Sequence, residues 1–342
     1  MKHMRFTGSG LGILIALALL VGFGAWRYDG FIGAYNILTV LRYNSMFALV
    51  GLGMCFVIIT GGIDLSVGSV AAMSSVVSAY LSPYGLVAGL VGGLLAGAAA
   101  GTLNGLIITK LKIFPFIATL AVMLAASGTG LLLANNQSVS VSYDTAFTAL
   151  GQGNLLSPLK PDWVDGDNAG WLGGVLSFVF GFPTPAWIAL IAYIIGSIAL
   201  NAMAFGRYVL SVGGGEEASR LMGLPTDRTV FLVYLISGTL AGMAGVILAA
   251  QFGAGQPIEG VGWELFAIAS VVVGGTLLTG GKGSVFATLA GVLLLGLIFT
   301  ILNFENGKGW ISLSAYWQSV VRGAILLLVV LLQSRLNRTA TA

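Results

Sequence analysis

The sequence contains few charged residues and almost no cysteine or histidine. Only 8% of its 342 residues are charged, whereas an ordinary soluble domain carries about 25%. A surface with so few charges would not stay in water, so most of it is expected to face lipid or other apolar helices. The single cysteine, Cys55, excludes an internal disulfide. Together with the single histidine, His3, it also excludes a multi-thiolate or His-rich metal site and a Cys/His nucleophile pair.

Basic clusters are absent as well. The net charge is only +3, and no run of lysine and arginine follows a helix or a tail, which excludes a nucleic-acid-binding surface. Hydrophobic residues make up 57% of the chain, which also has 51 glycines. Glycine is common where membrane helices pack closely. The composition therefore predicts an all-α, polytopic membrane protein with one transmembrane domain over residues 1–342.

Charge-free runs divide the chain into about ten predicted transmembrane helices of roughly 20 residues each. The run 65–109 is too long for one crossing, and Ser82-Pro83-Tyr84-Gly85 is a turn signal that divides it. The first run resembles a signal peptide, but we interpret it as an uncleaved span. The predicted runs are 6–26, 43–63, 65–109, 113–143, 171–206, 229–258, 265–281, 283–304 and 309–334, the last interrupted by Arg322.

Lysine and arginine near the span ends predict the orientation. With ten helices one side carries most of the basic residues, which makes it the cytoplasmic side and places both termini there (N-in, C-in). The basic residues of that side are Lys2, Arg5, Lys110, Lys112, Arg207, Arg220, Arg228, Lys282, Arg335 and Arg338. The other side carries Arg27, Arg42, Lys160 and Lys308.

Two loops are conspicuous. Residues 135–185 form a long predicted external loop, and residues 204–228 contain the main predicted cytoplasmic loop. Within the second, GGGEEASRLMG (213–223) indicates a glycine break and then a short helix with acidic residues at its positive N-terminal end. Glycine and proline end that helix. The residues singled out here are Gly213, Gly214, Glu216, Glu217, Arg220, Leu221 and Gly223.

Residues 35–110 and 229–304 form a weak internal repeat. In each copy an acidic residue opens an apolar helix, a glycine-containing break follows, and a second apolar helix ends the unit. On the ten-helix count the two copies run in opposite directions, as in many transporters whose substrate path lies at the repeat interface.

A glycine stripe and scattered polar residues complete the pattern. Glycine at every fourth position gives one helix a flat face, which indicates close helix packing; the stripe is Gly89, Gly93, Gly97, Gly101 and Gly105. Asp64 either caps the helix that follows it or lines a translocation path or its gate, because an acidic residue at membrane depth is costly. The candidate path residues are Asp64, Ser66, Asn104, Gln251, Gln256, Glu264 and Asn303.

Residues 275–283 (GTLLTGGKG) come close to a phosphate-binding loop but do not match its pattern. The first glycine of G-x4-G-K-[ST] is replaced by Thr276, and Lys282 is followed by glycine. We therefore expect no ATP, and no other cofactor, to be bound by this chain.

Four segments resemble a known family: ITGGIDLSVGS (59–69), GGGEEASRLMGLP (213–225), SGTLAGMAGVI (237–247) and GWELFAIASVVVGGTLLTGGKGSV (262–285). They are similar to the permease subunits of bacterial ATP-binding-cassette (ABC) importers for ribose, xylose, arabinose and galactose. The last segment, with ILNFENG (301–307), is most similar to the galactofuranose-type permeases. The likeness extends over about residues 36–332.

This resemblance implies a non-enzymatic subunit of the bacterial inner membrane. Its partners would be a second permease chain, identical or different, two cytoplasmic ATPase subunits that bind ATP and Mg, and a periplasmic sugar-binding protein. Residues 216–223 would then contact the ATPase. The residues alone leave one alternative, an ion-coupled secondary transporter that uses Asp64, Glu264 and Arg322 as a charge relay. An intramembrane enzyme is disfavoured because paired catalytic groups are lacking.

Overall fold

The computed structural model describes residues 8–165 and 170–308, and the single positions 317, 320, 321, 323, 324 and 327. Within this part of the chain six helices are long and apolar enough to cross a membrane, which confirms the all-α polytopic class. They are α2 (Ala34–Ile59), α4 (Leu86–Lys110), α5 (Pro115–Leu133), α8 (Thr184–Asn201), α11 (Thr226–Phe252) and α13 (Val285–Lys308). The number of ten and the N-in, C-in orientation stay predictions. Arg322 and most of the predicted last span lie outside the residues described.

The remaining elements complete the described fold. They are α1 (Gly8–Arg27), α3 (Val67–Leu81), α6 (Ala149–Gln152), α7 (Gly170–Phe180), α9 (Ala204–Gly214), α10 (Glu216–Leu221) and α12 (Trp263–Val273), the 3-10 turns η1 (Ser82–Tyr84), η2 (Ala146–Thr148), η3 (Ser157–Leu159) and η4 (Asp162–Asp165), and the strands β1 (Val139–Ser140) and β2 (Ala254–Gly255). At 1.5 Å per residue, α3 and α12 are about 22 and 16 Å long. Both are shorter than the roughly 30 Å hydrocarbon core of a bilayer.

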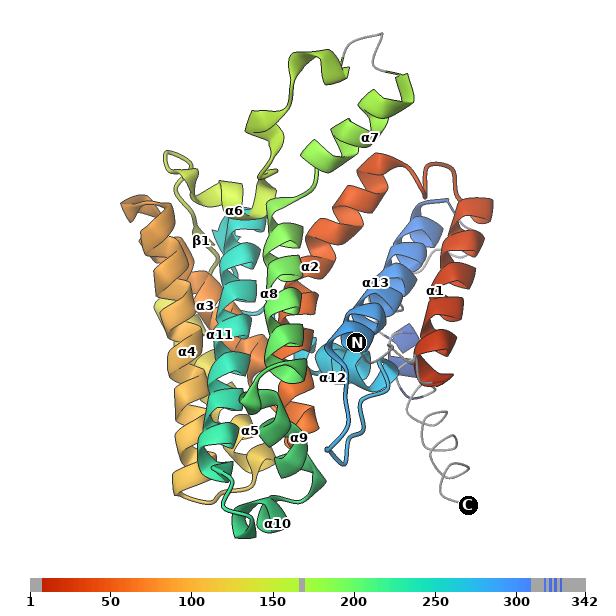
Figure 1. The fold of residues 1–342 in the computed structure, drawn as a ribbon. Coiled ribbons are helices and arrows are strands. Elements are labelled where there is room, and N and C mark those ends of the chain that lie inside the picture. The colour runs from red at the N-terminus through yellow and green to blue at the C-terminus, as the bar shows by residue number, and fades with distance from the viewer. Residues whose placement is uncertain are drawn as a thin grey trace.

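The long helices lie side by side and run between the two ends of the molecule (Figure 1). One end carries α9, α10 and the turn between α4 and α5; the other carries β1, α6 and α7. The segment α2–α3–α4 contains a long, a short and a long helix, and so does α11–α12–α13. The long helices of the first segment run toward the α10 end, and those of the second run away from it.

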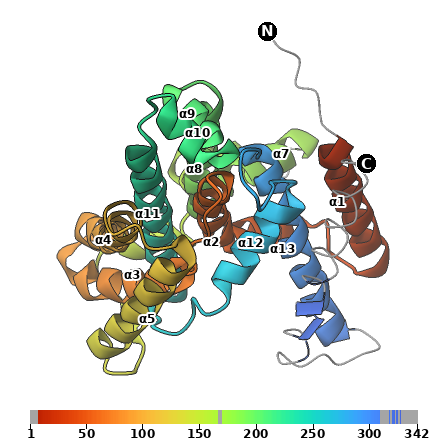
Figure 2. The ribbon, with the colours of Figure 1, turned by 90° about the horizontal axis from the view of Figure 1, so that it is seen from below.

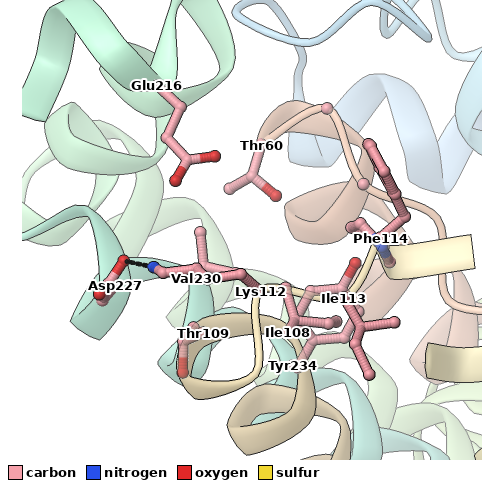
Figure 3. A pocket seen from close by; sticks show the side chains of 13 residues that line it. Thr60, Ile108, Thr109, Lys112, Ile113, Phe114, Glu216, Asp227, Val230 and Tyr234 are labelled. Atoms are coloured by element: carbon pink, nitrogen blue, oxygen red, sulfur yellow. Dashed lines mark hydrogen bonds and ion pairs between the residues drawn. The ribbon is translucent and has the colours of Figure 1, made fainter.

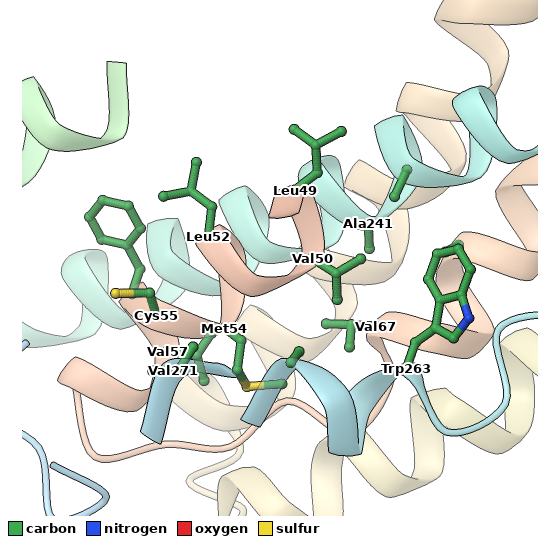
Figure 4. Close-up of a cluster of buried hydrophobic side chains, with 14 of the residues drawn as sticks. Leu49, Val50, Leu52, Met54, Cys55, Val57, Val67, Ala241, Trp263 and Val271 are labelled. Carbon is green, nitrogen blue, oxygen red and sulfur yellow. The ribbon is translucent and has the colours of Figure 1, made fainter. Parts of the chain in front are cut away.

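The core surrounds α2. In its most apolar 18-residue window 83% of the residues are buried, so this helix is covered by protein on nearly all sides. Figure 4 shows its side chains packed between α11 and α12, with Leu49, Val50 and Met54 among them. Cys55 is a free, buried thiol in the same cluster, as its apolar sequence context indicates. The outer helices are α1, α4, α5 and α8 (Figure 2). They expose large apolar side chains, among them Leu19, Leu95, Leu132 and Ile195.

The glycine stripe of α4 lies against α11. A Cβ on Gly97 would overlap the carbonyl oxygen of Gly238 and would lie 2.6 Å from the Cα of Gly242. Gly101 meets the backbone of Tyr234 in the same way. Elsewhere on the stripe the nearest atoms belong to side chains, with Phe147 over Gly89, Ser78 and Val246 beside Gly93, and Phe231 beside Gly105. Two glycine faces thus bring the backbones of α4 and α11 into direct contact, the arrangement that small residues permit in membranes.

Several predicted spans end earlier than their charge-free runs. The run 113–143 is helical only to Leu133, because Asn135 and Asn136 adopt left-handed conformations that end the helix. The run 171–206 contains two separate apolar helices, α7 and α8, with Pro183 between them. The first part of the predicted external loop 135–185 lies at the end of α11, because β1 pairs with β2 just beyond that helix.

Candidate functional site

α10 is a separate short helix at one end of the molecule (Figure 1). Glu216 and Glu217 occupy its first turn, where the helix dipole favours negative charge. Gly223, with φ of 79°, ends it in the left-handed conformation that glycine adopts without strain. The hydroxyls of Ser219 and Ser211 lie 2.9 Å apart and join α10 to α9. Beyond these contacts Leu221 is 85% exposed, which leaves an apolar tip uncovered in this chain.

A chain of charges ties α10 to the rest of the protein. Arg220 donates to Glu216 at 2.8 Å and to Asp227 at 3.3 Å. Asp227, in the first turn of α11, also accepts from Lys112 at 2.7 Å. Lys112 lies in the turn between α4 and α5 and has a φ of 55°, unusual for a residue with a side chain. The four side chains are about half exposed, so their ion pairs contribute little to the free energy of unfolding. Their main effect is to fix the position of α10.

A cavity of about 280 Å³ lies beside this charge chain. Figure 3 shows Glu216 and Thr60 on one side of it and the Lys112–Asp227 pair on the other. The hydroxyl of Tyr234 is buried at its wall and has no hydrogen-bond partner among the described residues. Because Glu216 of α10 and residues 60–62 at the end of α2 both line the cavity, it lies between α10 and the break that separates α2 from α3.

Asp64 is the centre of a buried polar cluster in that break. Its side chain is 1% exposed. One carboxylate oxygen accepts from the backbone N–H of Ser66 at 3.0 Å and from its hydroxyl at 2.6 Å. The other oxygen accepts from the hydroxyl of Ser237 on α11 at 2.8 Å. Asn104 of α4 donates to the Ser66 hydroxyl at 2.9 Å. Three of the predicted path residues, Asp64, Ser66 and Asn104, therefore belong to one cluster.

Asp64 shows features of both roles that the sequence allows, capping the following helix and lining a translocation path or its gate. Its bond to Ser66 N–H organises the residue that precedes α3, which is a capping-type contact. Its bond to Ser237 reaches another helix, and local capping does not require this. No ion pair involves Asp64 in the described part of the chain, so hydrogen bonds alone compensate the burial of its carboxyl group.

Glu264 lies in the first turn of α12, close to the start of α3. A Cβ on Gly68 would overlap the carbonyl oxygen of Gly260 and would lie 2.9 Å from Oε2 of Glu264. The N-terminal ends of the two short helices therefore approach each other within the helical bundle. Such ends carry partial positive charge, and discontinuous helices of this kind form substrate sites in many transporters.

The other predicted path residues lie elsewhere. Gln251 is 14 residues beyond Ser237 on α11, which is about 21 Å along the helix. Its side-chain amide is buried without a partner among the described residues. Gln256 follows β2 and bonds Ser75 through its backbone, and Asn303 is exposed on α13. The structure does not bring these three residues to Asp64.

Some residues of the site are missing from the sequence prediction. Ser237 lies within an apolar, glycine-rich helix, where a lone serine gives little signal. The pairing of Lys112 with Asp227 joins positions 115 residues apart, so no local pattern reveals it. The described residues contain no group of three or more His, Cys, Asp or Glu side chains that could hold a metal ion.

Comparison with known proteins agrees with this architecture. A family model described as branched-chain amino acid transport system / permease component matches residues 36–330. The ribose import permease protein RbsC of Escherichia coli is 35% identical over 324 residues, which cover 94% of this chain and 92% of the relative. The L-arabinose transport system permease protein AraH of the same species is 35% identical over 322 residues, 94% of this chain and 89% of the relative.

A third relative, the inner membrane ABC transporter permease protein YjfF of Escherichia coli, is 37% identical over 318 residues, 91% of this chain and 87% of the relative. No solved structure matches the chain. Because the family model and the relatives both match nearly the whole chain, it belongs to the family of inner-membrane ABC importer permeases that includes the ribose and arabinose permeases.

Proposed function

We propose that this chain is the membrane-spanning subunit of an ATP-driven importer that carries a monosaccharide across the bacterial inner membrane. The named functions of the ribose and arabinose relatives support the substrate class. The observation that carries the proposal is α10, a short helix that projects from the bundle with an exposed apolar tip at Leu221 and Met222. A pore that works alone has no need of such a docking element.

In this proposal residues 204–228 are the cytoplasmic coupling loop. Glu216, Glu217, Arg220, Leu221 and Gly223 form the element that contacts an ATPase on another polypeptide, which binds ATP and Mg. Gly213 and Gly214 belong to the same loop but connect this element to the end of α9. The end of the molecule with α10 then faces the cytoplasm, and residues 135–185 face the periplasm, where a sugar-binding protein delivers the solute. Both termini lie on the cytoplasmic side, and about ten helices cross the membrane.

The translocation pathway is proposed to run beside the converging ends of α3 and α12. The cores 35–110 and 229–304 are taken as inverted repeats, with Glu264 near their meeting point. Because Asp64 is 1% exposed, we assign it to the gate, where it holds the start of α3 with Ser66 and Asn104. Gln251, Gln256 and Asn303 would serve nearer the periplasmic end. A second permease chain, identical or different, completes the pore, and a furanose such as galactofuranose is a candidate solute.

The test is reconstitution. The chain is co-expressed with its cognate ATPase, placed in liposomes with the cognate binding protein and supplied with radiolabelled ribose, arabinose or galactose. We expect uptake that requires both ATP and the binding protein. Uptake by the chain alone, driven by a sodium or proton gradient, would instead establish the ion-coupled carrier. A thermal-shift screen of the binding protein against pentoses and hexoses identifies the sugar.

A further inference from the structure

Three glycine-rich breaks of the chain meet at one carbonyl group. The first is the end of α2, where the helix stops at Ile59 and Gly61 adopts a left-handed φ of 83°. The second is the connection between α12 and α13, which contains Gly280 and Gly281 with φ of 84° and 77°. The third is the end of α9 at Gly213 and Gly214, directly before α10. We call this meeting point the glycine junction.

The contacts at the glycine junction are between backbones. The N–H of Gly281 donates to the carbonyl of Ile59 at 2.9 Å. This carbonyl belongs to the last turn of α2 and has no partner within its own helix. A Cβ on Gly213 would overlap both that carbonyl oxygen and the nitrogen of Gly281. A Cβ on Gly280 would lie 2.9 Å from the carbonyl oxygen of Gly213 and 2.9 Å from the nitrogen of Gly61.

Not every glycine of the chain is packed so tightly. At Gly214, the next residue along α9, an added Cβ would meet nothing within 4 Å. The same holds for Gly128 on α5 and for Gly30 before α2. Close backbone contact therefore does not follow from glycine content alone, because a Cβ at each of these three positions would point into open space.

We propose that the glycine junction transmits the movement of α10 to both broken helices of the transport core. Side chains can change rotamer and absorb a displacement, whereas backbones in contact move together, as in other packed elements that shift as rigid bodies. A displacement of α9 is therefore transferred to Ile59 and to Gly281. Five residues after Ile59 is Asp64, which holds the start of α3; Gly281 lies in the connection that follows α12.

This assignment also gives a role to the glycine-lysine-glycine motif at 280–283, which does not match a phosphate-binding loop. Its left-handed glycines let the α12–α13 connection reach the end of α2 without a Cβ in the way. The inference rests on the proposed function, because it concerns what happens inside the permease after the ATPase has moved α10.

The first experiment uses Gly213→Ala in the complete reconstituted importer, with Gly128→Ala as the control for a helical glycine. ATP hydrolysis, sugar uptake and co-purification of the ATPase are measured together. We expect Gly213→Ala to keep the ATPase bound and hydrolysing ATP while the amount of sugar moved per ATP falls by about tenfold. Gly128→Ala is expected to keep the wild-type ratio. A wild-type ratio in Gly213→Ala would overturn the proposal.

Gly281→Ala tests the second arm of the junction, with Gly30→Ala as a control for the strain of a left-handed φ. Hydrogen–deuterium exchange on the unmodified complex gives an answer even if a variant does not assemble. With ATP and orthovanadate added, we expect exchange to change in 57–64 and 277–283 together with 211–217. A change confined to 211–217 would refute transmission. If the wild-type complex shows no ATP-dependent uptake, it is the proposed function that fails.

Discussion

The hydroxyl of Ser237 donates a hydrogen bond of 2.8 Å to Oδ2 of Asp64. This bond joins the middle of α11 to the connection between α2 and α3. On the neighbouring Gly238 of α11, the glycine face meets Gly97 and Gly101 of α4. Asn104 of α4 closes the group through the Ser66 hydroxyl. The glycine faces therefore hold α4 against α11 by close packing, and the polar cluster joins both helices to the α2–α3 connection by hydrogen bonds.

Replacing Ser237 with alanine is expected to destabilise the protein. The change removes one of the three hydrogen bonds that compensate the buried Asp64 carboxyl group. Loss of a partner to a buried polar group costs about 1–3 kcal/mol, so the midpoint of thermal unfolding in detergent should fall. Thr129→Ala is the matched control, because that exposed hydroxyl bonds only a carbonyl of its own helix. Equal midpoints for the two variants would contradict the prediction.

The glycine faces predict a larger effect at Gly97. A Cβ there meets the backbone of Gly238 and Gly242, which cannot yield by rotating a side chain. Gly97→Ala should force α4 and α11 apart and cost about 1–3 kcal/mol or more, the usual range for overpacking. Thermal unfolding and size-exclusion profiles measure the loss. Gly22→Ala in α1, where a Cβ meets nothing within 4 Å, is the comparison, and a similar loss there would argue against specific packing.

These two sites show what the sequence reveals and what it leaves open. The spacing of Gly89 to Gly105 predicts a flat helix face, and its helix is where we expect it. The partner face on α11 is visible only in three dimensions, since pairing depends on tertiary packing. Likewise the cost of a carboxylate in an apolar region marks Asp64, whereas its partner Ser237 lies 173 positions away.

Helix boundaries are harder to predict for a different reason. Hydropathy follows composition, and the residues after Leu133 stay uncharged although the helix has ended. The positive φ of Asn135 and Asn136 is a local conformational event that a hydropathy window does not detect. The predicted run 113–143 is therefore too long at its end. The run 43–63 begins too late for the opposite reason, because α2 starts at Ala34 and continues through Arg42, which the charge-based boundary excludes.

Breaking the charge chain is expected to change the coupling of ATP hydrolysis to sugar uptake but not the stability of the protein. Lys112 and Asp227 are 53% and 47% exposed in their side chains, and exposed pairs contribute only about 0–1 kcal/mol. Lys112→Ala should therefore leave the unfolding midpoint nearly unchanged. It should reduce sugar uptake per ATP, because α10 loses its link to the turn between α4 and α5.

The charge reversal Lys112→Asp with Asp227→Lys tests whether the pairing itself matters. The double variant should recover coupling that each single variant loses, since it restores opposite charges at the same two positions. Raised salt should weaken the wild-type link in the same direction as Lys112→Ala, because exposed charges are screened. Full coupling in both single variants would show that the link is dispensable.

The exposed tip of α10 gives the most direct test of docking. Leu221 is 85% exposed, so Leu221→Ser removes no packing within this chain, and the unfolding midpoint of the isolated permease should not change. If the tip is buried against the ATPase, the substitution removes an apolar anchor worth about 1.5–3 kcal/mol, which corresponds to roughly a tenfold to hundredfold weaker complex. Co-purification and titration with the separately purified ATPase measure this loss.

Leu159→Ser is the matched control, because that leucine is 71% exposed but lies in η3, far from α10 along the chain and at the other end of the molecule. Equal ATPase affinity in the two variants would remove α10 from the docking surface, and the cytoplasmic orientation proposed for this end would then lose its main support.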